Sequence, residues 1–105
     1  INTELVEWVS NLVRATRASH SEVKFVNEWV RWGAGPRAGQ AMILTAKARA
    51  LLSERFAVTQ DDIRHVAYPV LRHRILMNFK AESEGVTSDA VTAHLLETIS
   101  IRKGI

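Results

Sequence analysis

The residues best placed to do chemistry in this chain surround one arginine at the start of an alanine-rich segment. The stretch WVRWGAGPRAGQA, residues 29–41, contains Gly33, Gly35, Pro36 and Arg37. Proline suits the first position of a helix, because its missing N–H would have no partner there. Glycine lets another group approach the backbone closely and adopts conformations closed to other residues. Arg37 therefore falls in a first helical turn, where the helix dipole disfavours a cation.

This arrangement indicates a phosphate-binding site. The backbone N–H groups at a helix start favour negative charge, and a guanidinium can bind two oxygens of one phosphate. The alternative is a tight turn between helices whose arginine pairs with a surface carboxylate. The spacing by itself leaves both interpretations open, because short motifs also match by accident.

A second basic cluster, Arg72, His73 and Arg74, lies in the run PVLRHRI that starts at Pro69. Its simplest interpretation is a solvated face whose apolar neighbours turn into the core. The functional alternative is a contact with phosphate or with an acidic neighbouring subunit. Because Pro69 should stop or kink the preceding helix, we expect at least one of the two arginines to point outward.

Other kinds of chemistry have little support in the sequence. No Walker A phosphate loop occurs, and the histidines lack paired ligand spacing, which argues against a metal site. These histidines are His20, His65, His73 and His94. Asp61 and Asp62 are adjacent carboxylates, for which helix capping is a better interpretation than acid–base catalysis. We therefore expect no catalysis from this chain by itself.

Composition sets broad limits on the class of protein. The 105 residues are 47% hydrophobic and 24% charged, with a net charge of +3, which suits one globular domain and permits an anionic partner without requiring one. The absence of cysteine fits a cytoplasmic location. No apolar run is long enough to span a membrane. Because the chain begins at Ile1 and enters a helical pattern at once, we expect it to be a piece of a longer protein.

The spacing of apolar residues predicts an all-α fold, a small bundle of four or five helices with short loops and no strand. Helices should begin near Asn2 or Thr3, at Pro36, at a capping box formed by Thr59 and Asp62, and at a Ser88 cap. A short helical segment is expected within residues 23–32. Residues 19–21 should form a turn, residues 54–58 a loop, and residues 82–85 a break in the pattern.

Three stretches together resemble a known family. LVRATR (residues 12–17), WGAGPRAGQAMILTAKARALL (32–52) and VTQDDIRHVAYPVLRHRI (58–75) are similar in order and spacing to the C-terminal lid of MoxR-family AAA+ ATPases. The likeness covers nearly the whole chain. Two residues depart from the family pattern: Gly35 replaces the usual serine before the proline, and Glu54 stands where many relatives have glycine.

The resemblance implies that residues 1–105 form a single helical lid domain, preceded by an α/β core that binds ATP and Mg²⁺ and hydrolyses ATP. In the family, the arginine after the Gly-x-Ser-Pro motif is sensor 2, which contacts the terminal phosphates. That role falls on Arg37, with Gly33, Gly35 and Pro36 shaping the approach. The family also implies a ring, usually a hexamer, that matures partner proteins as a chaperone and often works with von Willebrand factor A domain proteins.

Two other classes of function stay open. A helical nucleic-acid-binding module would use the basic character of the chain, yet the helix after Pro36 shows alanines and leucines around scattered Gln40, Lys47 and Arg49 instead of a basic face. A bare oligomerisation bundle is the third class. A salt-dependent shift with DNA would favour the first alternative, and a nucleotide response of the whole ATPase would favour the lid.

Overall fold

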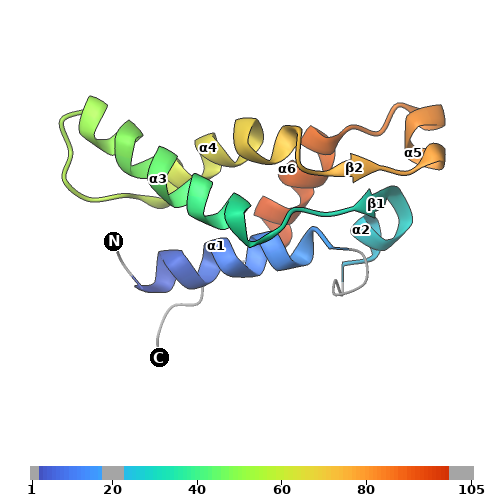
Figure 1. Ribbon diagram of the computed structural model, residues 1–105, viewed down its shortest axis with the longest axis horizontal. Coiled ribbons are helices and arrows are strands. Elements are labelled where there is room, and N and C mark those ends of the chain that lie inside the picture. The colour runs from blue at the N-terminus through green and yellow to red at the C-terminus, as the bar shows by residue number, and fades with distance from the viewer. Residues whose placement is uncertain (1–2, 18–22, 100–105) are drawn as a thin grey trace.

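The computed structural model describes residues 3–17 and 23–99, which form six helices and two short strands (Figure 1). The helices are α1 (Thr3–Ala15), α2 (Lys24–Trp29), α3 (Pro36–Leu52), α4 (Gln60–Arg72), α5 (Phe79–Glu84) and α6 (Ser88–Thr98). The strands are β1 (Val30–Trp32) and β2 (Leu76–Met77). The predicted all-α bundle is confirmed. The turn expected at residues 19–21, the histidine His20 and a cap at Asn2 lie outside the described residues.

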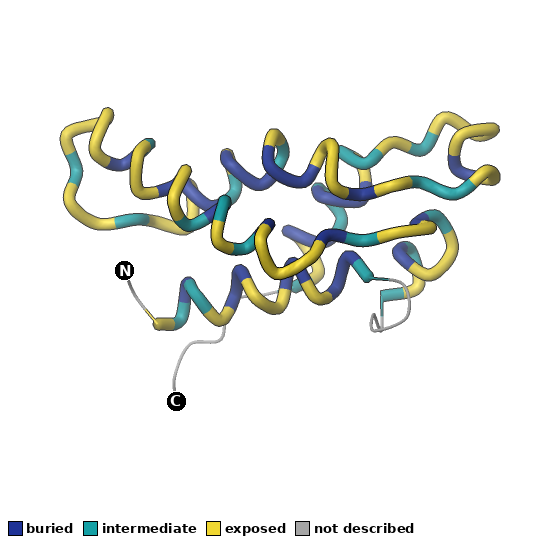
Figure 2. The backbone as a smooth tube through the Cα atoms, viewed as in Figure 1, coloured by how far each residue is buried: buried dark blue, intermediate teal, exposed yellow. Residues whose placement is uncertain are grey.

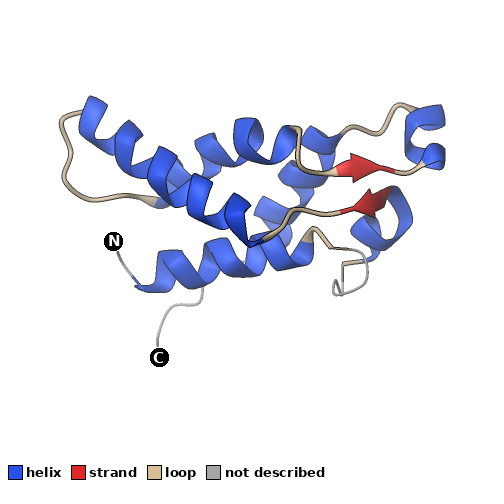
Figure 3. Ribbon diagram, in the orientation of Figure 1, coloured by secondary structure: helices blue, strands red, loops and turns tan. Residues whose placement is uncertain are grey.

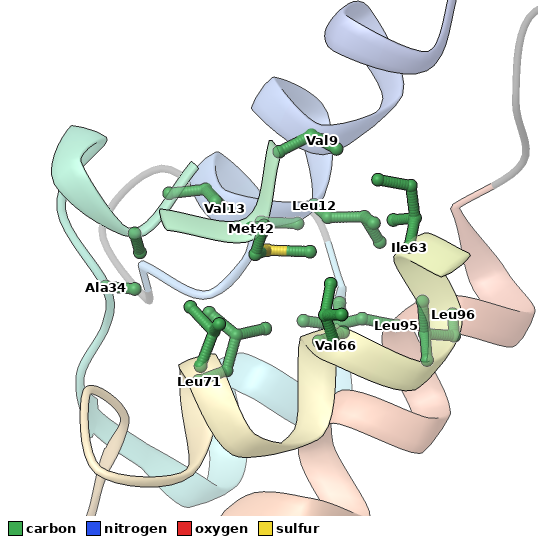
Figure 4. Close-up of a cluster of buried hydrophobic side chains, with 14 of the residues drawn as sticks. Val9, Leu12, Val13, Ala34, Met42, Ile63, Val66, Leu71, Leu95 and Leu96 are labelled. Atoms are coloured by element: carbon green, nitrogen blue, oxygen red, sulfur yellow. The ribbon is translucent and has the colours of Figure 1, made fainter. Parts of the chain in front are cut away.

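The four longer helices build one core (Figure 4). Helix α3 packs against α1 and α4, and α6 packs against α4 and α1. Their buried apolar faces meet in the middle, with Leu12 from α1, Met42 from α3, Ile63 from α4 and Leu95 from α6. On α3 the inward side chains are otherwise alanines, which let neighbouring helices approach closely. No helix among the described residues is long and apolar enough to cross a bilayer.

A two-stranded antiparallel ladder joins β1 and β2 at one end of the molecule (Figure 3). Val30 pairs with Met77 and Trp32 with Leu76, with an irregularity between the two pairs. The prediction of no strand was therefore wrong. Each partner has only two or three residues, too few for the alternating pattern that marks a strand in a sequence.

We expected Pro69 to stop or kink this helix; α4 runs through Pro69 and ends at Arg72, so the proline does not stop it. Proline removes one backbone hydrogen bond inside a helix. Here Val66 and Ala67 before it and Val70 and Leu71 after it are all buried. The packing of this apolar face on both sides of the proline offsets the lost hydrogen bond.

Two further boundaries differ from the prediction. The break expected at residues 82–85 falls at the end of α5, where Gly85 adopts the left-handed conformation at φ 73° and stops the helix. The cap of α6 is Thr87, whose hydroxyl accepts a hydrogen bond from the Ala90 N–H, one residue before the predicted Ser88. Helix α3 and the Thr59–Asp62 capping box of α4 lie where the sequence predicts them.

Candidate functional site

The candidate site is the first turn of α3. Gly35 is the N-cap residue, Pro36 the first helical residue and Arg37 the second. Gly35 has no side chain, so no side-chain hydrogen bond caps this helix. Pro36 has no N–H and the Ala38 N–H donates to the Gly35 carbonyl at 3.0 Å, so the open backbone donor in this turn is the Arg37 N–H. The turn therefore presents a backbone donor and a guanidinium on the same short segment, as the sequence predicts.

The end of α1 holds the segment that leads into this turn. The Thr16 hydroxyl, which is buried, donates to the Val13 carbonyl at 2.6 Å and accepts from the Ala34 N–H at 2.9 Å. Nε of Arg17 donates to the Ala34 carbonyl at 3.0 Å. Both backbone groups of Ala34 are thus bonded to side chains just after the end of α1, which fixes this residue of the approach to α3.

The two glycines before the helix have different roles. A Cβ on Gly33 would lie 2.3 Å from the carbonyl oxygen of Thr16, so only glycine fits this close approach. At Gly35 a Cβ would find only an ordinary contact, at 3.8 Å from Nη2 of Arg17. Neither glycine has a positive φ angle. The expectation of close approach is confirmed for Gly33, and the expectation of conformations closed to other residues was wrong for both.

The Arg37 side chain is exposed and makes no hydrogen bond or ion pair with any other described residue. A hollow of about 220 Å³ lies between α1 and the start of α3, and its lining residues include Arg14, Arg17 and Pro36 but not Arg37. We did not predict from the sequence that Arg14 and Arg17 lie beside Pro36, although LVRATR contains both residues, Arg14 on α1 and Arg17 just after it. No described carboxylate pairs with Arg37, so the interpretation as a surface ion pair finds no support in this part of the chain.

The second predicted cluster lies at the end of α4 and has partners within the chain. Arg72 forms two hydrogen bonds of 3.0 Å with the carboxylate of Asp89 on α6, and this contact raises the pKa of the arginine. Nη1 of Arg74 donates to the Val70 carbonyl at 2.6 Å. His73 is the exposed C-cap residue of α4. Both arginines are exposed, as expected, and no contact among the described residues joins the cluster to the start of α3.

A third group of charges was not predicted. The side chain of Asp62 is fully buried and accepts hydrogen bonds from Arg49 at 2.7 Å and from Arg55 at 2.6 and 2.8 Å. It also accepts from the Thr59 N–H at 2.8 Å in the capping box. The Arg55 contact above all, helped by Thr59 and Arg49, holds the pKa of this carboxyl well below its usual range, although burial acts in the opposite direction.

This arrangement fixes the role of Asp62. A carboxylate that is enclosed and held in its charged form cannot exchange a proton with a substrate near neutral pH. The predicted capping role is confirmed. Among the described residues, no three histidine, aspartate or glutamate side chains gather as a metal site would require.

The comparisons with known proteins define the class. The chain matches the AAA lid domain family over residues 24–95, from α2 into α6, and it belongs to this family. It is 31% identical over 102 residues to the chaperone MoxR1 of Mycobacterium tuberculosis. The aligned residues make up 96% of this chain and 27% of the relative. It is 30% identical over 95 residues to the uncharacterized protein YeaC of Bacillus subtilis, covering 90% of this chain and 27% of the relative.

A solved structure extends the same likeness to the fold. The crystal structure of a protein assigned as an ATPase from Cytophaga hutchinsonii superposes with a TM-score of 0.90 at 32% identity, over 97% of this chain and 31% of that one. The chain is therefore the lid domain of a MoxR-like AAA+ ATPase. It spans less than a third of the length of these relatives.

Proposed function

We propose that this lid supplies the sensor 2 arginine of the ATPase and that Arg37 is that residue. In this role Arg37 contacts the terminal phosphates of ATP bound to the α/β core, and the lid couples ATP binding and hydrolysis to movement. Arg37 is a binding residue, and the catalytic machinery belongs to the core, which we expect to precede the lid in the whole protein.

The observation that carries this proposal is a free cation on a firmly held support. The Arg37 side chain is exposed and has no partner among the described residues, while both backbone groups of Ala34 are bonded to Thr16 and Arg17, just after α1. A guanidinium in the first turn of a helix repels the positive end of the dipole. A bound phosphate would offset this repulsion and could accept a hydrogen bond from the Arg37 backbone N–H of the same turn.

The wider function follows from the family and is also proposed. The whole protein binds ATP and Mg²⁺ and assembles as a ring of neighbouring subunits, usually a hexamer in this family. In the cytoplasm it remodels or matures partner proteins. Proteins with von Willebrand factor A domains are candidate partners. At the start of α3, the positive helix end and the guanidinium of Arg37 suit the negative charge of the ATP phosphates. The described residues offer no group of metal-binding side chains, so Mg²⁺ would be held by the core.

The test is the steady-state ATPase rate of the full-length protein. Loss of a charge-assisted contact should lower turnover roughly tenfold to a hundredfold in Arg37→Ala. Arg37→Lys should recover only part of the rate, because an ammonium group cannot bind two oxygens in the planar geometry of a guanidinium. The matched control is Arg31→Ala, since Arg31 is also exposed and lies on the nearby strand β1.

Thermal melting of the same variants separates binding from folding. Arg37→Ala should melt at the temperature of the unmodified protein or slightly above it, because the repulsion by the helix dipole is relieved. An unchanged ATPase rate together with a lowered melting temperature would show that Arg37 is a structural residue. A salt-dependent shift with DNA that requires Arg37 would favour the nucleic-acid-binding module instead.

A further inference from the structure

Two arginines line a hollow that contains no carboxylate of its own. The hollow lies between α1 and the start of α3 and has a volume of about 220 Å³. Figure 2 shows exposed positions along α1 and at the start of α3, two helices that pack against each other. The lining residues come from both helices and from the second position after α1: Ser10, Val13, Arg14, Arg17, Pro36 and Gly39. None of these six residues is acidic, so nothing in the lining neutralises the two guanidinium groups.

The two guanidinium groups are both open to a ligand, but only one is fixed. Nε of Arg17 donates to the Ala34 carbonyl at 3.0 Å, while its Nη1 and Nη2 groups have no partner among the described residues. Arg14 is exposed, and Glu7, which lines the next hollow along α1, forms no ion pair with either arginine. Arg14 suits the negative end of the α1 dipole. That effect does not explain Arg17, which lies beyond the helix.

Gly39 leaves space in the wall of this hollow. It lies inside α3, where glycine lowers helix stability relative to alanine. A Cβ at this position would lie 3.6 Å from Cγ1 of Val9 and 3.7 Å from Cγ2 of Val13, which are ordinary contacts. The packing of α3 on α1 therefore does not require glycine here. The space beside it is kept at a cost to the helix.

The size and the walls of the hollow indicate which anion it suits. Sites that enclose small molecules have volumes of about 300–1,000 Å³, so 220 Å³ leaves room for one side chain and not for a nucleotide. Val13 and Pro36 form apolar wall beside the two cations. The methylene groups of an acidic side chain would contact this wall while its carboxylate meets the guanidinium groups. A free phosphate ion would lose water there without gaining such a contact.

We propose that this hollow binds one glutamate or aspartate side chain of a partner protein. Arg17 and Arg14 bind the carboxylate, and Val13 and Pro36 contact the methylene groups that carry it. The site is separate from the nucleotide role, because Arg37 is not among its lining residues. An acidic segment of the partner would thus be held on the lid beside the start of α3.

The experiment is an NMR titration of the isotope-labelled 105-residue chain with hexaglutamate, and hexaglutamine is the uncharged control peptide. Hexaglutamate should shift the backbone N–H signals of Val13, Arg17 and Gly39 most. Arg17→Gln and Arg14→Gln should each raise the dissociation constant about tenfold, because each removes a charge-assisted contact. Arg31→Gln is the matched control and should leave the constant unchanged, since Arg31 is exposed but lies outside the hollow.

Three results would overturn the proposal. The first is the absence of these shifts with hexaglutamate. The second is equal weakening in Arg31→Gln, because the binding would then reflect general charge attraction. The third is the same set of shifts at a lower concentration of inorganic phosphate or of a single-stranded oligonucleotide, which would assign the hollow to free anions or to nucleic acid.

Two further variants separate this site from folding and from the nucleotide role. Arg17→Gln also removes the bond to Ala34, so melting curves must show that this variant folds. Arg14→Gln removes no bond to a described residue and decides the outcome if Arg17→Gln does not fold. Arg37→Ala should bind hexaglutamate as the unmodified chain does, whatever its effect on ATP turnover.

Discussion

The arginine side chains at the two ends of α3 differ in whether they have a partner within the chain. At the end of the helix, Arg49 and, just beyond it, Arg55 both bind the buried carboxylate of Asp62. At the start, Arg37 has no partner among the described residues, although the backbone before it is bonded on both sides. One helix thus has arginines paired with a buried carboxylate at one end and, at the other, an arginine without a side-chain partner among the described residues.

The difference teaches which charges serve the fold and which are left for a ligand. Two cations around one enclosed anion tie α3, the following loop and α4 together, so both arginines have a structural partner within the chain. A cation whose support is rigid but whose guanidinium is unbonded is open to a ligand. Three substitutions test this comparison, in order of decreasing effect on stability.

Asp62→Asn should have the largest effect. It removes a buried charge that two arginines and a helix cap share, and we expect the free energy of unfolding of the 105-residue chain to fall by about 3 kcal/mol. Urea unfolding measures this change. The matched control is Asp61→Asn, because Asp61 is the exposed neighbour on the same turn and should change stability by no more than about 0.5 kcal/mol.

Acidification should reproduce the loss in the unmodified chain. The folded state lowers the pKa of Asp62, so its contribution is complete above the pKa of an unfolded aspartate, about 3.9, and fades as the pH falls toward the folded value. The gap in stability between the chain and Asp62→Asn should therefore be constant near neutral pH and shrink below about pH 4. A gap that grew on acidification would contradict the ion network.

Gly33→Ala should come second. The new Cβ would meet the backbone of Thr16, and because backbone cannot rotate away as a side chain can, we expect a loss of about 2 kcal/mol in unfolding free energy. Gly35→Ala is the control, since its Cβ finds an ordinary contact. In the full-length ATPase, Gly33→Ala should also slow turnover, because the start of α3 must shift. Equal stability of the two variants would show that the Thr16 backbone can move away from a Cβ at position 33 at little cost in free energy.

Glu54→Gly should have the smallest effect and the opposite sign. Glu54 follows α3 with φ 59°, the left-handed conformation that glycine adopts without strain. The Arg55 N–H bonds the Ala50 carbonyl and the Glu54 N–H bonds that of Leu51, as in a helix end made for glycine. Relief of the strain should raise stability by about 1 kcal/mol. Glu54→Ala, which keeps a Cβ, should not, and a lowered urea midpoint for Glu54→Gly would contradict the assignment.

The features that could be predicted from the sequence are those set by residues adjacent along the chain, such as helix starts and caps. The start of α3 at Pro36 and the capping box from Thr59 to Asp62 are set by local backbone chemistry. The unusual residue at Glu54 was visible as a departure from the family. The position of Arg37 in the first turn followed from the same local rules.

The contacts that hold the site depend on packing between helices and carry no local signal. Thr16 and Arg17 meet Ala34 only because α1 lies against α3. Arg49 and Arg55 share Asp62 only because α3 packs on α4. The same reason explains the pairing of β1 with β2, whose residues are distant in sequence and adjacent only in the fold.

The close contact of Gly33 with Thr16 has a mechanical consequence. Two glycines before a helix usually mark a place where the chain can pivot, yet rotation here would drive Gly33 into the Thr16 carbonyl and break both hydrogen bonds at Ala34. Gly33 and Ala34 are therefore fixed to the residues that follow α1, and a change in the direction of α3 has to come from rotation at Gly35, where the backbone meets no close contact.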